Sequence, residues 1–309
     1  MLTRSTTGRE AVRGARRTRR APRDTLIAFV MLAPALVLLA IFVIWPMVQS
    51  AYLSFFDWSF YRESVFVGFD NFRRVLTDDA FVASVGRGLL FALMVVPTQL
   101  VLAFAFASLV AGVSRRLASV LKVSVFIPTA ISTVIASIIF ILIYQYRGGI
   151  ANWAIGFLGI EAQAWLADVG LALPAMAVPA IWLGLGVAAL IMLAGLLDIP
   201  ASYYEAAVLD GAGWWQRTFA ITLPLMKNTF VYLTIAGFVA NVQQFELPLV
   251  LTKGGPQDAT MLPNLLIFSH FRDDPTVGYS IAAAFLLFIV LGTISALIFR
   301  FLNSTQSED

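Results

Sequence analysis

Six long apolar segments constrain the fold of this chain more than any other feature of its sequence. They cover about residues 26–45, 88–111, 123–144, 173–196, 229–251 and 280–302. A helix needs about 20 predominantly apolar residues to cross the hydrocarbon core of a bilayer. Only helices and closed barrels satisfy all their backbone polar groups in that environment. The sequence therefore predicts an all-α, polytopic membrane protein with six transmembrane helices.

The composition excludes several other classes of protein. Of the 309 residues, 60% are hydrophobic and 13% are charged, whereas soluble domains carry about 25% charged residues. The chain has no Cys, and its one His is His270, so disulfides, thiol chemistry and His-rich metal sites are excluded. It also lacks the Gly-rich phosphate loop of ATPases. We therefore expect no catalytic residue, no metal site and no cofactor bound by this chain.

The distribution of basic residues predicts how the spans are oriented across the membrane. Residues 1–25 carry eight of the 21 basic residues, and we expect a disordered cytoplasmic tail. A nucleic-acid-binding arm is disfavoured because the tail directly precedes an apolar run, where basic residues orient a membrane span. A signal peptide is also disfavoured, since the run at 26–45 exceeds the usual length and lacks a good cleavage site. Six spans from 26 to 302 then place both termini, including the tail 303–309, and the loop 198–227 in the cytoplasm.

The loop 198–227 contains a polar stretch with its own helix signals. Pro200 precedes it, and Ser202 with Glu205 has the spacing of a capping box, so a short helix is predicted over 202–210. Gly211 fits the left-handed residue that follows a helix end. A helix this short is marginal alone in water, so it needs a surface to dock against.

The residue pattern of this loop resembles the cytoplasmic motif of permease subunits in binding-protein-dependent ABC importers. The matching residues are Glu205, Ala206, Ala207, Asp210, Gly211 and Ala212, followed by Ile221, Leu223 and Pro224. The resemblance implies a coupling helix that docks on an ATPase subunit. The plainer interpretation is an amphipathic helix lying on the membrane surface. If the helix couples, Gly211→Val should separate ATP hydrolysis from transport, because a β-branched residue resists positive φ.

Three further stretches, 53–58, 67–72 and 251–256, resemble carbohydrate permeases of the maltose-transporter type. The chain is similar to short, six-span versions of the larger maltose permease subunit. The resemblance implies a prokaryotic cytoplasmic (inner) membrane location and a heterodimer with a second permease. It also implies two ATPase subunits that use ATP and Mg, and an external solute-binding protein. Beyond these proteins we expect contact with membrane lipid and no nucleic-acid partner.

Polar residues in the fifth apolar segment mark a candidate solute site. At 100° per residue, Asn241 and Gln244 lie within about 60° of each other, with Gly237 on the same side. Their amides suit the hydroxyl groups of a sugar because they both donate and accept hydrogen bonds. The resemblance adds Leu183 and Gly184 as residues that line the same site. The alternative role for Asn241 and Gln244 is hydrogen bonding between helices.

Glu246 is the one acidic residue within a clear span. It is a further candidate for contact with solute, or it pairs with Lys253 or Arg147. The resemblance of the loop 198–227 implies a permease subunit of an ATP-driven importer, and the amides of the fifth apolar segment suit a sugar or a related polyhydroxylated solute. A secondary transporter driven by an ion gradient is the alternative, and it would need ionisable residues in several spans.

Overall fold

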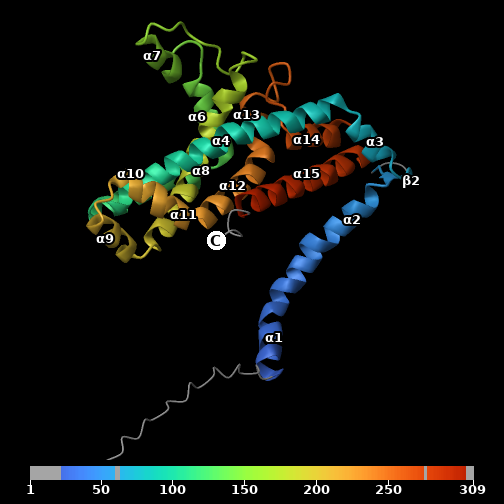
Figure 1. The fold of residues 1–309 in the computed structure, drawn as a ribbon. Helices are drawn as coiled ribbons and strands as arrows, with labels where there is room; N and C mark the ends of the chain where they lie inside the picture. The colour runs from blue at the N-terminus through green and yellow to red at the C-terminus, as the bar shows by residue number, and fades with distance from the viewer. Residues whose placement is uncertain (1–21, 60–62, 275–276, 304–309) are drawn as a thin grey trace, which may run out of the picture. The chain divides into compact units, whose positions relative to one another are not determined.

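The computed structural model describes residues 22–59, 63–274 and 277–303, and it is almost entirely helical (Figure 1). The all-α prediction is confirmed. The chain divides into two compact units, residues 1–50 and 51–309. Most of the predicted tail 1–25, and 304–309 of the predicted tail 303–309, lie outside the described residues, and the helix already begins at Pro22.

The first unit is one long apolar helix as far as the structure describes it. It consists of α1 (Pro22–Leu39), the π-helical turn η1 (Ala40–Ile44) and α2 (Trp45–Leu53), whose last residues belong to the second unit. Every residue from Phe29 to Ser50 is exposed. A helix that is apolar all round is stable only in an apolar environment, so this segment needs lipid or another protein around it.

The second unit begins with a small polar region and then becomes a helical bundle. The strands β1 (Phe56–Asp57) and β2 (Val65–Phe66) pair antiparallel, and α3 (Asp70–Leu76) follows. Asn71 on α3 fixes this region, since its side-chain amide donates to the carbonyl oxygens of Ser54 and Phe56 at 3.0 and 2.9 Å.

Three helices form the centre of the bundle: α4 (Asp79–Ala111), α8 (Ala172–Leu197) and α12 (Lys227–Val242). The most extensive contact in the unit is between α4 and α8, followed by that between α4 and α12. Small buried residues explain the close approach, because Ala103 and Ala107 of α4 meet Ala188 and Ala189 of α8 in one core cluster.

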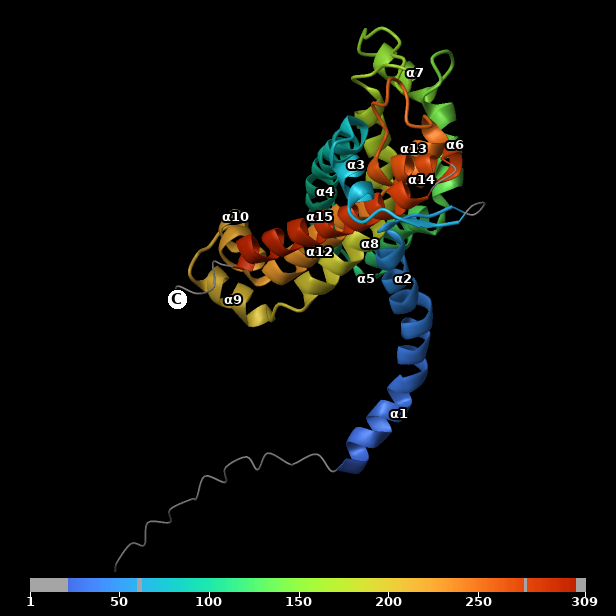
Figure 2. The same cartoon turned by 90° about the vertical axis from the view of Figure 1, so that its right-hand side faces the viewer.

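The long helix α15, together with shorter helices and turns, completes the unit around this centre. They are α5 (Arg115–Phe126), η2 (Ile127–Ala130), α6 (Thr133–Ile143), α7 (Ile150–Gly156), α9 (Ala201–Leu209), α10 (Trp214–Arg217), η3 (Thr218–Thr222), α11 (Leu223–Leu225), α13 (Glu246–Leu251), α14 (Pro263–Asp273) and α15 (Gly278–Asn303). Figures 1 and 2 both show α9 and α10 at the end of the bundle opposite to α7 and α13.

The spans differ from the predicted ones mainly by bends. Among the described residues, four helices are long and apolar enough to cross a membrane, and up to six if each of two bent pairs counts as one span. The predicted third span, 123–144, bends by 95° between Arg115–Ala130 and Thr133–Ile143. Pro128 lies in η2 at this bend, where a proline removes a backbone donor and disfavours helix in the residue before it.

The predicted fifth span, 229–251, is also divided. Within it, the chain leaves the helix at Gln244 and Phe245, between α12 and α13. Just before it, the segment Trp214–Leu225 meets Lys227–Leu251 at 66°. Asn264 on α14 donates from its side-chain amide to the Gln243 carbonyl oxygen at 2.7 Å. This bond satisfies a carbonyl that has lost its place in the helix.

Candidate functional site: a polar cavity and an exposed loop helix

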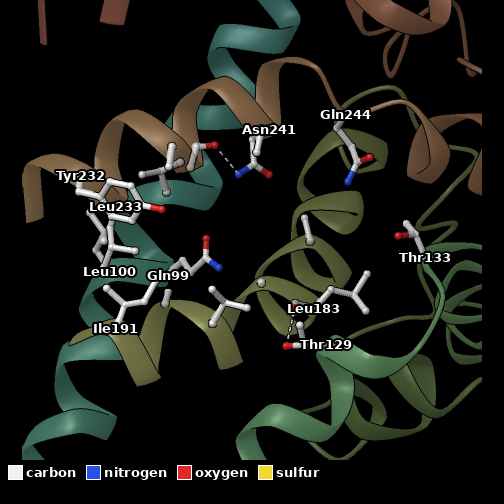
Figure 3. A pocket seen from close by; sticks show the side chains of 18 of the residues that line it. Gln99, Leu100, Thr129, Thr133, Leu183, Ile191, Tyr232, Leu233, Asn241 and Gln244 are labelled. Atoms are coloured by element: carbon white, nitrogen blue, oxygen red, sulfur yellow. Dashed lines mark hydrogen bonds between the residues drawn. The ribbon is translucent and has the colours of Figure 1, made fainter. Parts of the chain in front are cut away.

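A cavity of about 400 Å³ lies among α4, η2, α8 and α12 (Figure 3). Its polar lining residues are Gln99, Thr129, Thr133, Tyr232, Asn241 and Gln244. The remaining lining residues are apolar or glycine, and none is charged. We call it the central cavity. A cavity of this size and chemistry fits a small neutral molecule with several hydroxyl groups.

The structure brings together five of the six residues that the sequence suggested for solute contact. Asn241, Gln244 and Gly237 come from α12 and its end, and Leu183 and Gly184 come from α8. Glu246 is the exception, because it lies exposed in the first turn of α13 and is not among the residues that line the cavity. The described residues offer it no ion pair with Lys253 or Arg147.

The side-chain amides of Asn241 and Gln244 each make one local hydrogen bond and leave their other polar group unbonded within the described chain. Asn241 donates from Nδ2 to the Gly237 carbonyl oxygen at 2.8 Å, and the Gln244 Oε1 accepts from the Phe245 N–H at 3.0 Å. Both bonds are local, so neither amide joins two helices, which was the alternative role. Asn241 Oδ1 and Gln244 Nε2 have no hydrogen bond recorded within the described chain. One acceptor and one donor therefore remain free to face the hollow.

Gln99 is one of the polar lining residues that the sequence analysis missed, together with Thr129, Thr133 and Tyr232. It lies on α4, and Figure 3 shows its side chain pointing into the central cavity. Its amide packs on Gly184, where a Cβ atom would collide with the Gln99 Nε2. Thr98 and Gln99 interrupt an apolar run just after Pro97, and this pair of polar residues within a span was the signal that could have found it.

Thr129 joins the bent η2 segment to α8. Thr129 donates from Oγ1 to the Leu183 carbonyl oxygen at 3.0 Å. The absence of a side chain at Gly186 allows this approach, since a Cβ there would lie 2.6 Å from both Thr129 Oγ1 and the Val125 carbonyl oxygen. The bend at η2 is thus held against α8, and it places Thr129 and Thr133 in the lining of the central cavity.

The second candidate site is the short helix α9 in the loop 198–227. The helix ends in a full Schellman motif: the Gly211 N–H donates to the Val208 carbonyl at 3.0 Å, and the Ala212 N–H to the Ala207 carbonyl at 2.8 Å. Gly211 has a φ of 77°, so the predicted left-handed residue is confirmed. The chain then turns into α10 through Gly213, whose φ is −70°.

The predicted capping box at the start of this helix is wrong. The helix begins at Ala201, one residue early, and its N-cap is Pro200, with no side-chain hydrogen bond to the cap. Pro200 fixes φ at −60° and has no N–H of its own. The chain therefore enters the helix directly after it. Ser202 already lies in the first turn, so it cannot act as the cap for an amide three residues on.

The α9 helix presents an apolar surface with no covering element in the described chain. None of its residues is buried, and Leu209 is 88% exposed, Val208 55% and Tyr203 53%. Its side-chain bond to the rest of the loop is between Tyr204 Oη and Thr222 Oγ1, at 2.9 Å. Glu205 and Asp210 are also exposed. This surface is the one that a docking partner would cover.

The second half of the sequence motif lies at the C-terminal end of the same loop. Ile221 lies in η3 and is half-buried, while Leu223 and Pro224 form the start of α11. Of the residues in the first half, Ala207 and Ala212 are half-buried, and Ala206 is exposed. The two halves of the motif are therefore parts of one loop that ends at the start of α12.

Metal chemistry has no candidate site in the described part of the chain. There, no group of three or more His, Cys, Asp or Glu side chains could hold a metal ion. The His270 ring packs on Tyr279, with 4.3 Å between ring centroids.

Comparisons with known proteins agree on one family. Residues 99–307 match the family model of the binding-protein-dependent transport system inner membrane component. The sulfoquinovosyl glycerol transport system permease protein SmoG of Agrobacterium fabrum is 32% identical over 91% of this chain and 92% of its own length. The trehalose/maltose transport system permease protein MalF of Thermococcus litoralis is 31% identical over 88% and 92%.

The fold is also that of a solved transporter chain. A chain from the crystal structure of a bacterial ABC transporter involved in the import of the acidic polysaccharide alginate superposes with a TM-score of 0.78 at 21% identity, covering 93% of this chain and 98% of its own length. A second structure, in which that type of transporter is in complex with an alginate pentasaccharide-bound periplasmic protein, gives a TM-score of 0.74 at 22% identity, covering 93% and 95%. The chain belongs to the family of binding-protein-dependent transport system inner membrane components, the permeases of ABC transporters.

Proposed function

We propose that this chain is a permease subunit of an ATP-driven importer, and that a sugar or a related polyhydroxylated solute passes through the central cavity. The observation that carries the proposal is the uncharged, amide-lined hollow among α4, α8 and α12. The names of the relatives support it, because they include permeases for sulfoquinovosyl glycerol, for trehalose and maltose, and for multiple sugars.

The second element of the proposal is coupling through α9. The partner ATPase subunits bind ATP and Mg, and the exposed surface of Tyr203, Val208 and Leu209 docks on one of them. The loop that carries α9 joins α8 directly to the segment leading into α12. Both helices line the central cavity, so a pull on the loop changes the shape of the cavity from two sides.

Family membership also suggests the other subunits of the transporter. We infer a second permease chain, two ATPase subunits and an external solute-binding protein, in a prokaryotic cytoplasmic membrane. The α9 end of the bundle faces the cytoplasm, since Arg115, Arg116 and Arg217 lie in the segments at that end, and basic residues favour that side. Family membership leaves the ion-gradient alternative without support.

The proposal is tested by mild solubilisation of the tagged chain, followed by identification of the proteins that co-purify. We expect a second permease and an ATPase subunit with the natural sequence. With Glu205→Ala combined with Gly211→Val, we expect the second permease to remain and the ATPase to be lost. Recovery of a chain that stands alone and still transports solute would contradict the proposal.

A further inference from the structure

Two adjoining hollows lie between α4 and the loop that carries α9, apart from the central cavity. The first, of about 670 Å³, is lined by the end of α8, by α9 and α10, and by the last turns of α4. Its polar lining residues are Ser108, Asp198, Tyr204, Arg217, Thr218 and Thr222. We call it the head hollow.

Arg217 is the unusual member of the head hollow. Its Nε is buried and has no hydrogen-bond partner, and the described chain provides no ion pair for its guanidinium. Because Nε is closed to solvent, it does not itself open into the hollow, and only the rest of the side chain can contribute to the lining. The planar guanidinium group matches a phosphate or carboxylate through paired N–H donors. The hollow therefore has the chemistry of an anion site.

The charged residues near Arg217 are of both signs. Arg115 and Arg116 are exposed at the start of α5, a few residues after Ala111, which lines the head hollow. Asp198 is the one acidic lining residue, and it is exposed at the C-terminal end of α8. Glu205 and Asp210 of α9 are exposed at the same end, so the two signs balance there, and Arg217 is the one basic residue that lines the head hollow.

The second hollow is apolar and continuous with the first. It has a volume of about 800 Å³ and shares Phe104, Ser108, Trp214 and Thr218 with the head hollow. Its other lining residues are Pro97, Leu100, Val101, Ala105, Leu109, Trp215, Phe219, Leu223 and Phe230. We call it the tail groove. It runs along α4 from the head hollow toward the middle of the membrane span.

The rim of the tail groove has the character of a membrane interface. Trp214 and Trp215 contact edge to face with 4.5 Å between ring centroids, and Trp215 stacks on Phe219 at 5.9 Å. Trp215 is 67% exposed and Phe219 62%. Tryptophan is enriched where the hydrocarbon core meets the headgroups. A polar hollow with a guanidinium thus opens into an apolar groove at the depth where a lipid changes from headgroup to acyl chain.

We propose that the head hollow and the tail groove together bind one anionic phospholipid from the leaflet on the α9 side. Its phosphate pairs with Arg217, and one acyl chain lies along α4 between Val101 and Leu109. A soluble anion would use only the head hollow and leave the tail groove uncovered. Leu100 lines both the tail groove and the central cavity, and no other lining residue of either hollow belongs to the central cavity. The proposal depends neither on the nature of the solute nor on the coupling role of α9.

The experiment uses the complete assembly in phosphatidylcholine vesicles that contain a small share of a photoactivatable phosphatidylglycerol. A parallel sample contains a photoactivatable phosphatidylcholine instead, and labelled peptides are mapped in both. We expect phosphatidylglycerol to label residues 97–109 and 214–223. Arg217→Gln should reduce this labelling about fivefold or more, because one basic residue adds about that factor to the binding of an anionic lipid. Labelling by phosphatidylcholine should fall less than about twofold, because its choline cancels the charge of its phosphate.

Three variants make the result specific. Arg217→Lys keeps the charge and should keep most of the labelling. Ala105→Trp fills the tail groove away from Arg217 and should reduce labelling of residues 97–109 by both lipids. Arg116→Gln, an exposed arginine at the same end of the bundle, should change the labelling less than about twofold.

Several outcomes would overturn the proposal. One is equal labelling of the two peptides by both lipids. Another is unchanged phosphatidylglycerol labelling in Arg217→Gln when the variant elutes as an intact assembly. Absence of any lipid label would mean that a protein subunit covers the groove. Loss of the label on addition of inorganic phosphate would mean that the head hollow binds a free anion.

Discussion

Gln99 packs against Gly184 in the wall of the central cavity. The Gln99 amide occupies the space that a Cβ at position 184 would need. We expect Gly184→Ala to push the Gln99 side chain into the hollow and to lower the rate of solute uptake about tenfold, because well-packed sites tolerate added methyl groups poorly. The measurement is uptake of the solute by vesicles that contain the assembly.

The double variant Gly184→Ala with Gln99→Ala provides the internal test of this prediction. Removing the amide should restore space and recover much of the uptake. Gly86→Ala on the same helix as Gln99 is the matched control, since a Cβ there meets nothing within 4 Å. An equal loss of uptake in Gly86→Ala and Gly184→Ala would mean that the contact has no special role.

The amides of Asn241 and Gln244 give a second prediction at this scale. Asn241→Leu removes one acceptor from the cavity, and the loss of one hydrogen bond of about 1 kcal/mol should raise the KM for solute about fivefold. Glu246→Gln is the comparison, and we expect its KM to stay within about twofold, because Glu246 lies exposed outside the cavity lining. A larger effect from Glu246→Gln than from Asn241→Leu would contradict the assignment.

These residues also show what the sequence could predict about the site. The polar cluster at 241–246 was visible as an interruption in an apolar span, and helical periodicity related Asn241 to Gly237. Gln244 lies in the same cavity for a different reason, since it is past the end of α12 and no longer follows that periodicity. Gln99 needed knowledge of which helices pack together, because its neighbour Gly184 is 85 positions away in the sequence.

The element that carries the coupling proposal is α9, and its critical residue is Gly211. With a φ of 77°, a branched side chain there is strained by roughly 1–2 kcal/mol, so Gly211→Val should disturb the end of α9. We expect vesicles with this variant to hydrolyse ATP while solute uptake falls about tenfold or more. The ratio of solute moved to ATP hydrolysed is the measured quantity.

Gly213→Val is the matched control for this prediction. The same substitution two residues away falls at a φ of −70° and ψ of 172°, which valine adopts readily. Its ratio of solute to ATP should therefore remain near that of the natural sequence. Similar ratios in the two variants would show that backbone geometry at Gly211 does not matter for coupling.

The loop that contains α7 gives a further prediction at the level of elements. Asn152 is 8% exposed and holds this loop through its side chain: Nδ2 donates to the Gln163 carbonyl at 3.0 Å, and Oδ1 accepts from the Trp165 Nε1–H at 2.9 Å. Asn152→Ala leaves these groups unpaired, at a cost of about 1–3 kcal/mol. Hydrogen exchange should accelerate in residues 145–165 and stay unchanged in α8.

Gln163→Ala is the control for the loop, because the Gln163 side chain only donates to the Glu161 carbonyl at an exposed position. Exchange in 145–165 should remain nearly unchanged in this variant. If Asn152→Ala and Gln163→Ala gave the same exchange rates, the side chain of Asn152 would not be what orders the loop.

The helices were easier to predict than their bends. The fourth apolar segment was predicted at 173–196 and forms α8 over 172–197, because one continuous apolar run leaves a helix no alternative in a membrane. The third segment contains Pro128, which could suggest a break, but the 95° angle could not be predicted from it. The bond between Thr129 and the Leu183 carbonyl holds the bent segment against α8, and periodicity, which describes one helix at a time, does not predict contacts between helices.

At the scale of the whole molecule, the bundle connects two regions that lie at its opposite ends. The α9 loop lies at one end and α7 at the other (Figures 1 and 2), and α8 and α12 run from the loop to the central cavity. The apolar surfaces of α9 and of residues 29–50 have no cover within the described parts of their own units. Both features fit a chain that functions as one part of a larger membrane assembly.

The central claim is that ATP-driven movement of α9 changes access to the central cavity. The chain has no Cys, so one introduced thiol can report on this access. Ala240→Cys places it in the lining of the cavity, and Ala162→Cys places a control thiol at an exposed position outside it. The rate at which a membrane-impermeant thiol reagent labels each position is measured in the complete assembly, with and without ATP.

We predict that ATP changes the labelling rate of Ala240→Cys at least about tenfold, that the control thiol is insensitive, and that adding Gly211→Val removes the effect of ATP on Ala240→Cys. An unchanged rate at Ala240→Cys with ATP, or an ATP effect that persists in the Gly211→Val background, would contradict the account.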